Sequence, residues 1–273
     1  MVINVKEYIL KEKEDGSVIT VRQLQLVLLE MMKDIDEVCR KNDIPYWLTG
    51  GSALGAVRHK GFIPWDDDAD IGMMREDYER FLKVVHQLGD KYVIQSFETH
   101  KEYNVLIPPM KIRLKGTYCK EANFLLKNKC KDSDGIFIDV FIVDHVSEQQ
   151  FKDVFWRCRN GILMVLIALF ENLHINPTLL KKRFVRNAKK YGNINQNSPM
   201  VGYDLTWTFN SFFHPVIYPY DSIFPVQYVA FEDTQLPIPR DPDFMLNNEV
   251  GANYMSFPPE HAQAPKHIKD IEL

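Results

Sequence analysis

The acidic run Asp66-Asp67-Asp68-Ala69-Asp70 leads directly into an apolar segment, Ile71-Gly72-Met73. Side chains alternate in an extended chain, so Asp66, Asp68 and Asp70 would project to one side and Asp67 to the other. Carboxylates placed together repel one another and are costly to desolvate, and a hard cation among them offsets that cost. The run predicts a strand over residues 68–73 whose start carries a Mg²⁺ or Mn²⁺ site.

A solvated acidic turn, or a set of helix caps on an exposed loop, is the alternative explanation of the run. Trp65 precedes the acids and the apolar segment follows them, so the chain enters a buried strand. Caps would not continue into such a strand, and the flanks therefore favour the metal site.

Gly50-Gly51-Ser52 follows a short predicted strand, Tyr46–Thr49, and opens a helix predicted over residues 52–58 with Ser52 as its cap. Glycines let a ligand approach the backbone closely, and the first N–H groups of a helix favour a phosphate. A lone Gly-Gly-Ser would be a plain tight turn. Followed by a strand that carries D-x-D, it predicts a phosphate-binding loop.

The segment GIFIDVFIV, residues 135–143, is β-branched and aromatic and predicts a central strand. Its one carboxylate, Asp139, needs a partner in such surroundings. A buried salt bridge to Lys111 or Arg113 is one explanation. A place beside Asp68 and Asp70 in the same sheet is the one we expect. Asp144, at the end of the strand, reads as a cap or turn residue.

Helical and strand periodicities alternate along the rest of the chain, which predicts an α/β (α+β) fold. Helices are expected at residues 20–42, 76–88, 148–172 and 178–191, and strands at residues 92–96 and 110–113, the latter pairing with a segment near Thr117.

Composition narrows the class of protein. The 273 residues are 45% hydrophobic with a net charge of −4, typical of a globular protein and without the basic excess of a nucleic-acid binder. The four cysteines form no C-x-x-C pair, which argues against a zinc site. The charged start, MVINVKEYILKEKEDG, lacks the apolar core of a secretory signal. A cytoplasmic location with reduced thiols is expected.

The most apolar stretch is GILMVLIALF, residues 161–170. It falls well short of the roughly 20 residues that span a membrane. We expect a buried core helix, with docking on a membrane surface as the alternative.

Prolines and aromatic residues crowd together from Asn193 onward. We expect residues 1–192 to form the catalytic core and residues 193–273 an irregular extension that packs on it and contributes to the substrate cleft. Core packing is the commoner role for aromatic residues in this extension, but they could also hold a quaternary ammonium group: Tyr203, Trp207, Phe209, Phe212 and Phe213.

Basic residues near these motifs could bind phosphates. They are Arg58-His59-Lys60, just before the acids, and Lys111 with Arg113, which share one face of a predicted strand. A solvated turn and structural ion pairs are the respective alternatives. His261 and His267 are expected to be surface residues.

Three segments resemble the LicD family in order along the chain, from the first helix to about residue 260. They are GGSALGAVRHKGFIPWDDDADIGMMREDYERF, GIFIDVFIVD and LPIPRDPDFMLNNEVGANYMSFPPE. That family includes bacterial phosphocholine transferases that decorate cell-surface glycans, and it is related to fukutin and fukutin-related protein, which transfer ribitol phosphate. The resemblance implies a nucleotidyltransferase-type fold, a small mixed sheet flanked by helices, and a CDP-linked donor.

The resemblance also assigns residues. It implies substrate binding by Gly50, Gly51, Ser52 and Arg58, and we add Lys111 to this set from its place on the predicted strand. It implies metal binding by Asp66, Asp68, Asp70 and Asp139, with Asp68, Asp70 and Asp139 catalytic. The closing motif departs from the family at Val250-Gly251, where a tyrosine-glycine pair is usual.

The expected function is metal-dependent transfer of a phospho-alcohol group, phosphocholine first, to a hydroxyl of a cell-surface glycan or its precursor, such as lipopolysaccharide or teichoic acid. A lipid-linked glycan acceptor would bring the chain to the inner face of the membrane as a peripheral contact. One rival is a nucleotidyltransferase that moves NMP from an NTP to a small acceptor. The other is a non-catalytic binding protein on the same scaffold.

Overall fold

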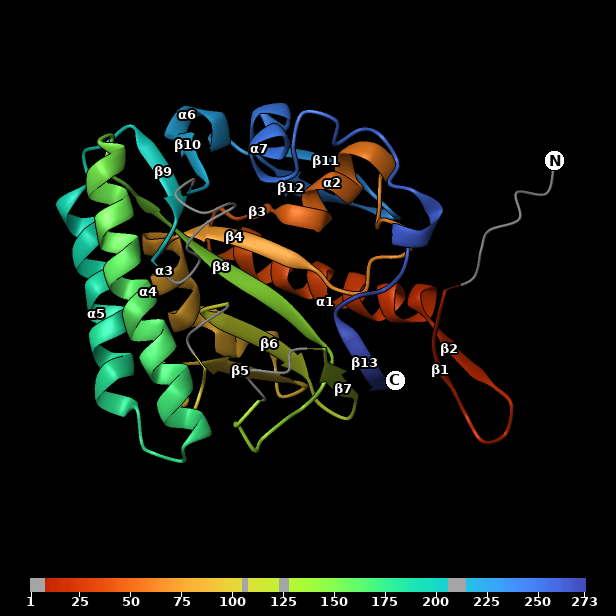
Figure 1. The fold of residues 1–273 in the computed structure, drawn as a ribbon. Coiled ribbons are helices and arrows are strands. Elements are labelled where there is room, and N and C mark those ends of the chain that lie inside the picture. Colours follow the sequence, from red (N-terminus) through yellow and green to blue (C-terminus); the bar gives the residue numbers. More distant parts are fainter. Residues whose placement is uncertain (1–7, 105–107, 123–127, 206–214) are drawn as a thin grey trace.

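A mixed seven-stranded sheet runs through the centre of the molecule (Figure 1). The computed structural model describes residues 8–104, 108–122, 128–205 and 215–273. The long strand β8 organises the sheet, because it pairs in parallel with β4 on one edge and antiparallel with β6 and then β9 on the other. The strands are β3 Trp47–Leu48, β4 Asp70–Met74, β5 Tyr92–Ser96, β6 Met110–Leu114, β8 Phe137–His145, β9 Met200–Tyr203 and β10 Ile217–Pro219.

Helix α1, Val21–Lys41, begins as its sequence predicts. Thr20 accepts a hydrogen bond from the Gln23 N–H, and the Gln23 side chain accepts one from the Thr20 N–H, which is a capping box. The apolar face of α1 packs into the main core with the sheet, and α3, Arg75–Val84, continues into a 3-10 turn, Val85–Leu88. Helices α4, Gln150–Asn172, and α5, Thr178–Ile194, lie side by side along one flank of the molecule (Figure 1).

Shorter elements surround the start of β4. Helix α2, Gly50–His59, contacts α7, Pro242–Glu249, and the hairpin β11–β12 lies beside them. The C-terminal strand β13 pairs with β7, and β1 pairs with β2. The remaining bounds are β1 Ile9–Glu12, β2 Val18–Thr20, β7 Tyr118–Glu121, α6 Tyr220–Ile223, β11 Gln227–Phe231, β12 Thr234–Ile238, a 3-10 turn Glu260–Ala262 and β13 Ile268–Glu272.

The α/β class and the mixed sheet are confirmed, and two strands differ from expectation. The strand expected from Asp68 begins at Asp70. The strand Met110–Leu114 pairs with β5 and β8, so the pairing expected near Thr117 was wrong; that segment leads into β7 and pairs with β13. Periodicity identified these strands but carries no information on their partners.

The chain after residue 193 contributes to the central sheet. Strands β9 and β10 extend it beyond β8, so the sheet crosses the division that we expected at residue 192. Of the aromatic residues considered for quaternary ammonium binding, Tyr203 is buried against Phe141. The other four, Trp207, Phe209, Phe212 and Phe213, lie outside the described residues.

The apolar stretch 161–170 is helical, but the expectation that it forms a buried core helix was wrong. Within it Ile167 is buried, whereas Ile162, Val165 and Leu169 are exposed. Among the residues that the structure describes, no helix is both long and apolar enough to cross a membrane.

Candidate active site

Four carboxylates gather where β4 and β8 begin. Asp70 is the first residue of β4, and it stands opposite Asp139 in the parallel register of the two strands. The Asp139 N–H donates to the Ala69 carbonyl at 3.0 Å, which extends this alignment into the acidic run. Asp66 and Asp68 lie just before the strand, close enough for the charge of Asp68 to raise the pKa of Asp66 in addition to the effect of burial. The sheet therefore brings together the acids that the sequence places about 70 residues apart.

Burial makes the ionised forms of these groups costly. It raises the pKa of Asp70 well above its usual range, and the neighbouring charges of Asp68 and Asp139 raise it further. Burial followed by the charge of Asp68 does the same to the pKa of Asp66. Burial raises the pKa of Asp139 to about 6 despite the attraction of Lys111. Such a cluster of oxygen donors is suited to a hard divalent cation, because a cation relieves the repulsion.

The phosphate-binding loop predicted at Gly50-Gly51-Ser52 faces these acids. Gly50 has a φ of +54°, and a Cβ on Gly51 would lie 2.6 Å from an Asp66 carboxylate oxygen, so a side chain there would collide with the cluster. The Ser52 hydroxyl accepts a hydrogen bond from the Asp70 N–H at 2.9 Å. The expectation that Ser52 caps the helix was wrong: α2 begins at Gly50, and Ser52 joins its first turn to β4.

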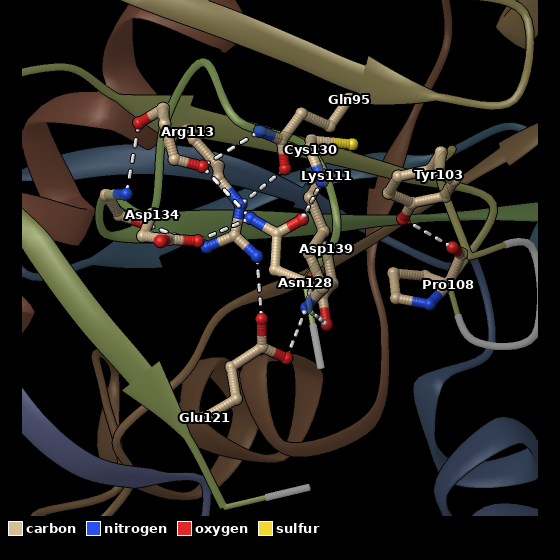
Figure 2. Close-up of polar contacts among 12 residues, drawn as sticks. Gln95, Tyr103, Pro108, Lys111, Arg113, Glu121, Asn128, Cys130, Asp134 and Asp139 are labelled. Carbon is tan, nitrogen blue, oxygen red and sulfur yellow. Dashed lines mark hydrogen bonds and ion pairs between the residues drawn. The ribbon is translucent and has the colours of Figure 1, made fainter. Parts of the chain in front are cut away.

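The sequence left two explanations of Asp139 open, a salt bridge to a basic residue and a place in the acid cluster, and the structure shows both. It lies beside Asp70, and the Lys111 ammonium is 2.8 Å from its Oδ1. Lys111 also pairs with Glu121 at 3.1 Å, as Figure 2 shows. Arg113 is not its partner, since that guanidinium binds Gln95, the Gly135 carbonyl and Glu121. Lys111 therefore links the acid cluster to Glu121, which Arg113 also binds.

Asp67 has different partners from the other acids. Its buried carboxylate accepts hydrogen bonds from the backbone N–H groups of Lys266, His267 and Ile268, at 2.8 to 3.2 Å. This holds the C-terminal segment against the acidic run. Asp67 thus anchors the chain rather than joining the group of Asp68, Asp70 and Asp139.

The same anchor brings His267 to the site. Its Nδ1 lies 3.3 Å from Asp68 Oδ2, although its ring is about half exposed. Among the described residues, Asp66, Asp67 and His267 are the one trio whose ligand atoms lie within 4.8 Å of one another. Since Asp67 already accepts backbone hydrogen bonds, its oxygens are the least available of the three. The expectation that His267 is a surface residue agrees with its exposure, but its contact with Asp68 was not foreseen, because nothing in the tail marks it as lying near the acidic run.

Glu249, at the end of α7, is a second residue that the sequence did not reveal. Its buried carboxylate accepts hydrogen bonds from the Gly50 N–H at 3.1 Å, from the Tyr203 hydroxyl at 2.7 Å and from the Tyr218 hydroxyl. Burial raises its pKa. The closing motif therefore contacts the loop directly, through the residue that precedes Val250-Gly251.

Arg58 ties α2 to the same C-terminal region. Its Nη1 donates to the carbonyls of Tyr254 at 2.8 Å and Ser256 at 3.1 Å, and the guanidinium stacks over Phe257. Asp66 is close enough to raise the pKa of Arg58, although burial lowers it more. Arg58 thus stands beside the acids, and phosphate binding by it stays a prediction.

A cavity of about 340 Å³ lies at the other ends of β4 and β8, away from the acids. Arg75 at its edge forms ion pairs with Asp144 and Asp204, so Asp144 is a buried ion-pair residue rather than the cap or turn residue that we expected. Neither the predicted metal ligands nor the glycine loop line this cavity.

The chain is similar to a known protein family and to several known proteins. Residues 43–162 match the family model described as LicD/FKTN/FKRP, nucleotidyltransferase domain. The chain is 29% identical to the lipopolysaccharide cholinephosphotransferase LicD of Haemophilus influenzae, over 93% of this chain and 98% of that protein. It is 46% identical to the human ribitol 5-phosphate transferase FKRP over 50 residues, which are 18% of this chain and 10% of that protein. An uncharacterised Rickettsia prowazekii protein, RP689, is 42% identical over 30% of this chain and 36% of its own length.

The matched range includes the glycine loop, the acidic run, Lys111 and Asp139. Glu249 and His267 lie beyond it, and the match to the Haemophilus protein extends over most of the chain on both sides.

Proposed function

We propose that the chain, whose residues 43–162 match the nucleotidyltransferase domain of the LicD/FKTN/FKRP family, is a phosphotransferase acting on a glycan. In the form that we favour, it moves phosphocholine from a CDP-linked donor to a hydroxyl of a cell-surface glycan or its precursor. The observation that carries the proposal is the meeting of Asp66, Asp68, Asp70 and Asp139 at the start of α2. A diphosphate donor needs both oxygen ligands for a cation and N–H donors for phosphate oxygens.

The donor set suits Mg²⁺ or Mn²⁺. Asp66, Asp68, Asp70 and Asp139 would hold the ion. Without a cation, burial and mutual repulsion disfavour the ionised forms of these carboxylates. When bound, such an ion offsets the negative charge that develops on the diphosphate during transfer.

The protein groups around the cluster would position the donor. The first N–H groups of α2, at Gly51 and Ser52, are suited to phosphate oxygens. Lys111, whose ammonium group contacts Asp139, supplies a positive charge beside the cluster. In-line displacement requires positioning and charge neutralisation more than covalent help, which agrees with a site rich in charges and backbone donors.

The proposed reaction forms one bond and breaks one. The acceptor hydroxyl oxygen attacks the phosphorus that bears the choline, and the bond from this phosphorus to the bridging oxygen of CMP breaks. CMP leaves with that electron pair. Asp139, whose pKa of about 6 is near neutrality, is suited to take the hydroxyl proton, and its alternative role is that of a metal ligand.

A nucleotidyltransferase is the second candidate, favoured by the description of the matched domain. It would use the same acids to move NMP from an NTP and release pyrophosphate. The two differ in the donor consumed and in the product released. A non-catalytic binding protein would not need to retain four carboxylates that repel one another.

Donor screening tests the proposal. Purified protein is incubated with CDP-choline, CDP-ribitol, CDP-glycerol, UDP-linked sugars, CTP and ATP, each with Mg²⁺ or Mn²⁺ and a glycan acceptor. Release of CMP from a CDP-linked donor, absent in Asp70→Asn, is the expected result. Release of pyrophosphate from CTP or ATP would establish the second candidate instead, and no turnover of any donor would favour the binding protein. The cytoplasmic location stays a prediction.

A further inference from the structure

Helix α4 presents its polar residues inward. Its buried face carries Asp153, Arg157, Asn160 and Glu171, with Ile167 among them. These groups are paired: Arg157 binds Asp153 at 2.7 Å, and Lys181 of α5 binds Glu171 at 2.5 Å. A helix on the surface of a protein in water normally shows the opposite arrangement.

The outward face of α4 is apolar instead. Phe151 is 81% exposed, Val165 66% and Ile162 64%, and each is a large side chain. Successive members are three, four or seven residues apart, so they form one stripe along the helix. We define the α4 stripe as Phe151, Phe155, Ile162, Val165, Leu169 and Leu173, all of them exposed.

The neighbouring helix α5 supplies positive charge. Its sequence, TLLKKRFVRNAKKYGNI, contains no acidic residue, and its outward residues Lys182, Arg183, Arg186 and Lys190 are exposed. Lys152 and Arg159 flank the stripe on α4 itself. The two acids of α4, Asp153 and Glu171, are buried. Basic residues are therefore the charged groups that α4 and α5 expose, on a chain whose net charge is −4.

We propose that the α4–α5 face, the α4 stripe with the flanking basic residues, docks on the anionic surface of a lipid bilayer. Apolar side chains that enter the headgroup region, together with Lys and Arg beside them, are the two contributions that bind a helix to such a surface. A second copy of this chain would be a poorer occupant. In a two-fold contact the same patch meets itself, which would bring the basic residues of both copies together.

Vesicle flotation tests the docking directly. The full chain is mixed with vesicles of phosphatidylcholine alone, or with phosphatidylglycerol added, and the bound fraction is measured without donor or acceptor. The result therefore does not depend on the proposed chemistry. Wild type should float with the phosphatidylglycerol vesicles, and binding should fall about tenfold when salt is raised to about 0.5 M. Ile162→Glu with Val165→Glu should abolish binding, and Arg183→Glu with Arg186→Glu should reduce it to that of neutral vesicles.

Matched changes elsewhere serve as controls. Leu26→Glu places a charge at an exposed apolar position on α1, and Lys83→Glu with Lys115→Glu reverses two exposed bases away from α4 and α5. Both should bind vesicles as wild type does. The proposal is overturned if wild type binds neutral and anionic vesicles equally, or binds neither. It is also overturned if sedimentation shows a wild-type dimer that Ile162→Glu with Val165→Glu converts to a monomer.

Discussion

Asp139 is at once a member of the acid cluster and the ion-pair partner of Lys111. These two relationships predict opposite effects on stability when the charge is removed. Burial opposes the ionised carboxylate, so its loss relieves a cost, whereas Lys111 loses a partner. Lys111 keeps Glu121 at 3.1 Å, which reduces that second penalty.

We therefore predict that Asp139→Asn melts no lower than wild type in the absence of metal, and that it loses turnover. Lys111→Met is the matched change, because it leaves Asp139 and Glu121 buried without their cation. It should lower the free energy of unfolding by roughly 3 kcal/mol. Thermal melts of the three proteins decide between these outcomes. An Asp139→Asn protein that melts far below wild type would show that Asp139 has a structural role.

Substitutions of the neighbouring acids should have different effects, because Asp68 and Asp70 belong to the cluster whereas Asp67 holds the C-terminal segment. Asp68→Asn and Asp70→Asn are each expected to abolish turnover with the fold intact, since both lie in the cluster. Asp67→Asn should be milder in turnover but should loosen residues 266–268, because an amide presents one acceptor oxygen to the three backbone N–H groups that Asp67 holds. Turnover and amide exchange of the C-terminal segment measure the difference. Equal loss of turnover in Asp67→Asn and Asp70→Asn would contradict the separate roles.

The sequence predicted the residues whose own pattern is unusual. Four acids within five residues before an apolar strand, and one acid within another, are conspicuous because burial of such groups is costly. His267 and Glu249 could not be found in this way. Each stands in an ordinary polar segment, and its importance comes from a contact with a residue about 200 positions away.

At the scale of elements, the start of α2 is fixed by its contact with the acids. Gly51→Ala would place a Cβ 2.6 Å from an Asp66 oxygen. We expect it to reduce turnover at least tenfold, because the acids or the helix must shift, and to lower stability by about 1–3 kcal/mol. Gly161→Ala is the control, since its Cβ would meet nothing within 4 Å in α4. That change should stabilise the protein by up to about 1 kcal/mol. Initial rates and denaturant unfolding measure both, and unchanged activity in Gly51→Ala would refute the close fit.

Periodicity located most elements but could not orient all of them. Helix α1 and strands β5 and β8 lie where their patterns predict, because each has one clear apolar face or an unbroken apolar run. Helix α4 was expected to be buried since residues 161–170 are almost wholly apolar. A uniformly apolar segment does not indicate which side faces the protein. The polar residues at 153, 157, 160 and 171 decided it, because Asp153, Arg157 and Glu171 form ion pairs and Asn160 forms hydrogen bonds with α5.

At the scale of the molecule, the C-terminal segments complete the site. Glu249 reaches the Gly50 N–H, Arg58 binds the carbonyls of Tyr254 and Ser256, and Asp67 holds residues 266–268. The C-terminal segments therefore cover part of the acid cluster. This cover contributes to the desolvation of the carboxylates, which raises their pKa values. Their protonation therefore depends on segments that are distant in the sequence.

Proton binding by these acids should govern the stability of the metal-free protein. A carboxyl whose folded pKa is raised binds a proton more readily in the folded state than in the unfolded state, where its pKa is near 3.8. Its contribution to stability is complete below pH 4 and is lost as the pH rises through the folded value. For Asp139 the loss falls between about pH 4 and pH 6 and amounts to roughly 3 kcal/mol at most. The pKa values of Asp66 and Asp70 are raised as well, so these two carboxyls add to the loss.

We predict that the metal-free protein melts several degrees higher near pH 5 than near pH 8, and that Mg²⁺ or Mn²⁺ narrows or reverses this difference. Metal binds the ionised carboxylates, so its stabilising effect should grow as the pH rises. Asp70→Asn combined with Asp139→Asn removes two of the titrating groups and should flatten the pH dependence without metal while abolishing the shift with metal. Scanning calorimetry from pH 5 to 8, with and without metal, provides the measurement. If the double variant keeps the wild-type pH slope, the slope arises elsewhere in the molecule, and if it keeps the metal-dependent shift, the ion binds to other residues.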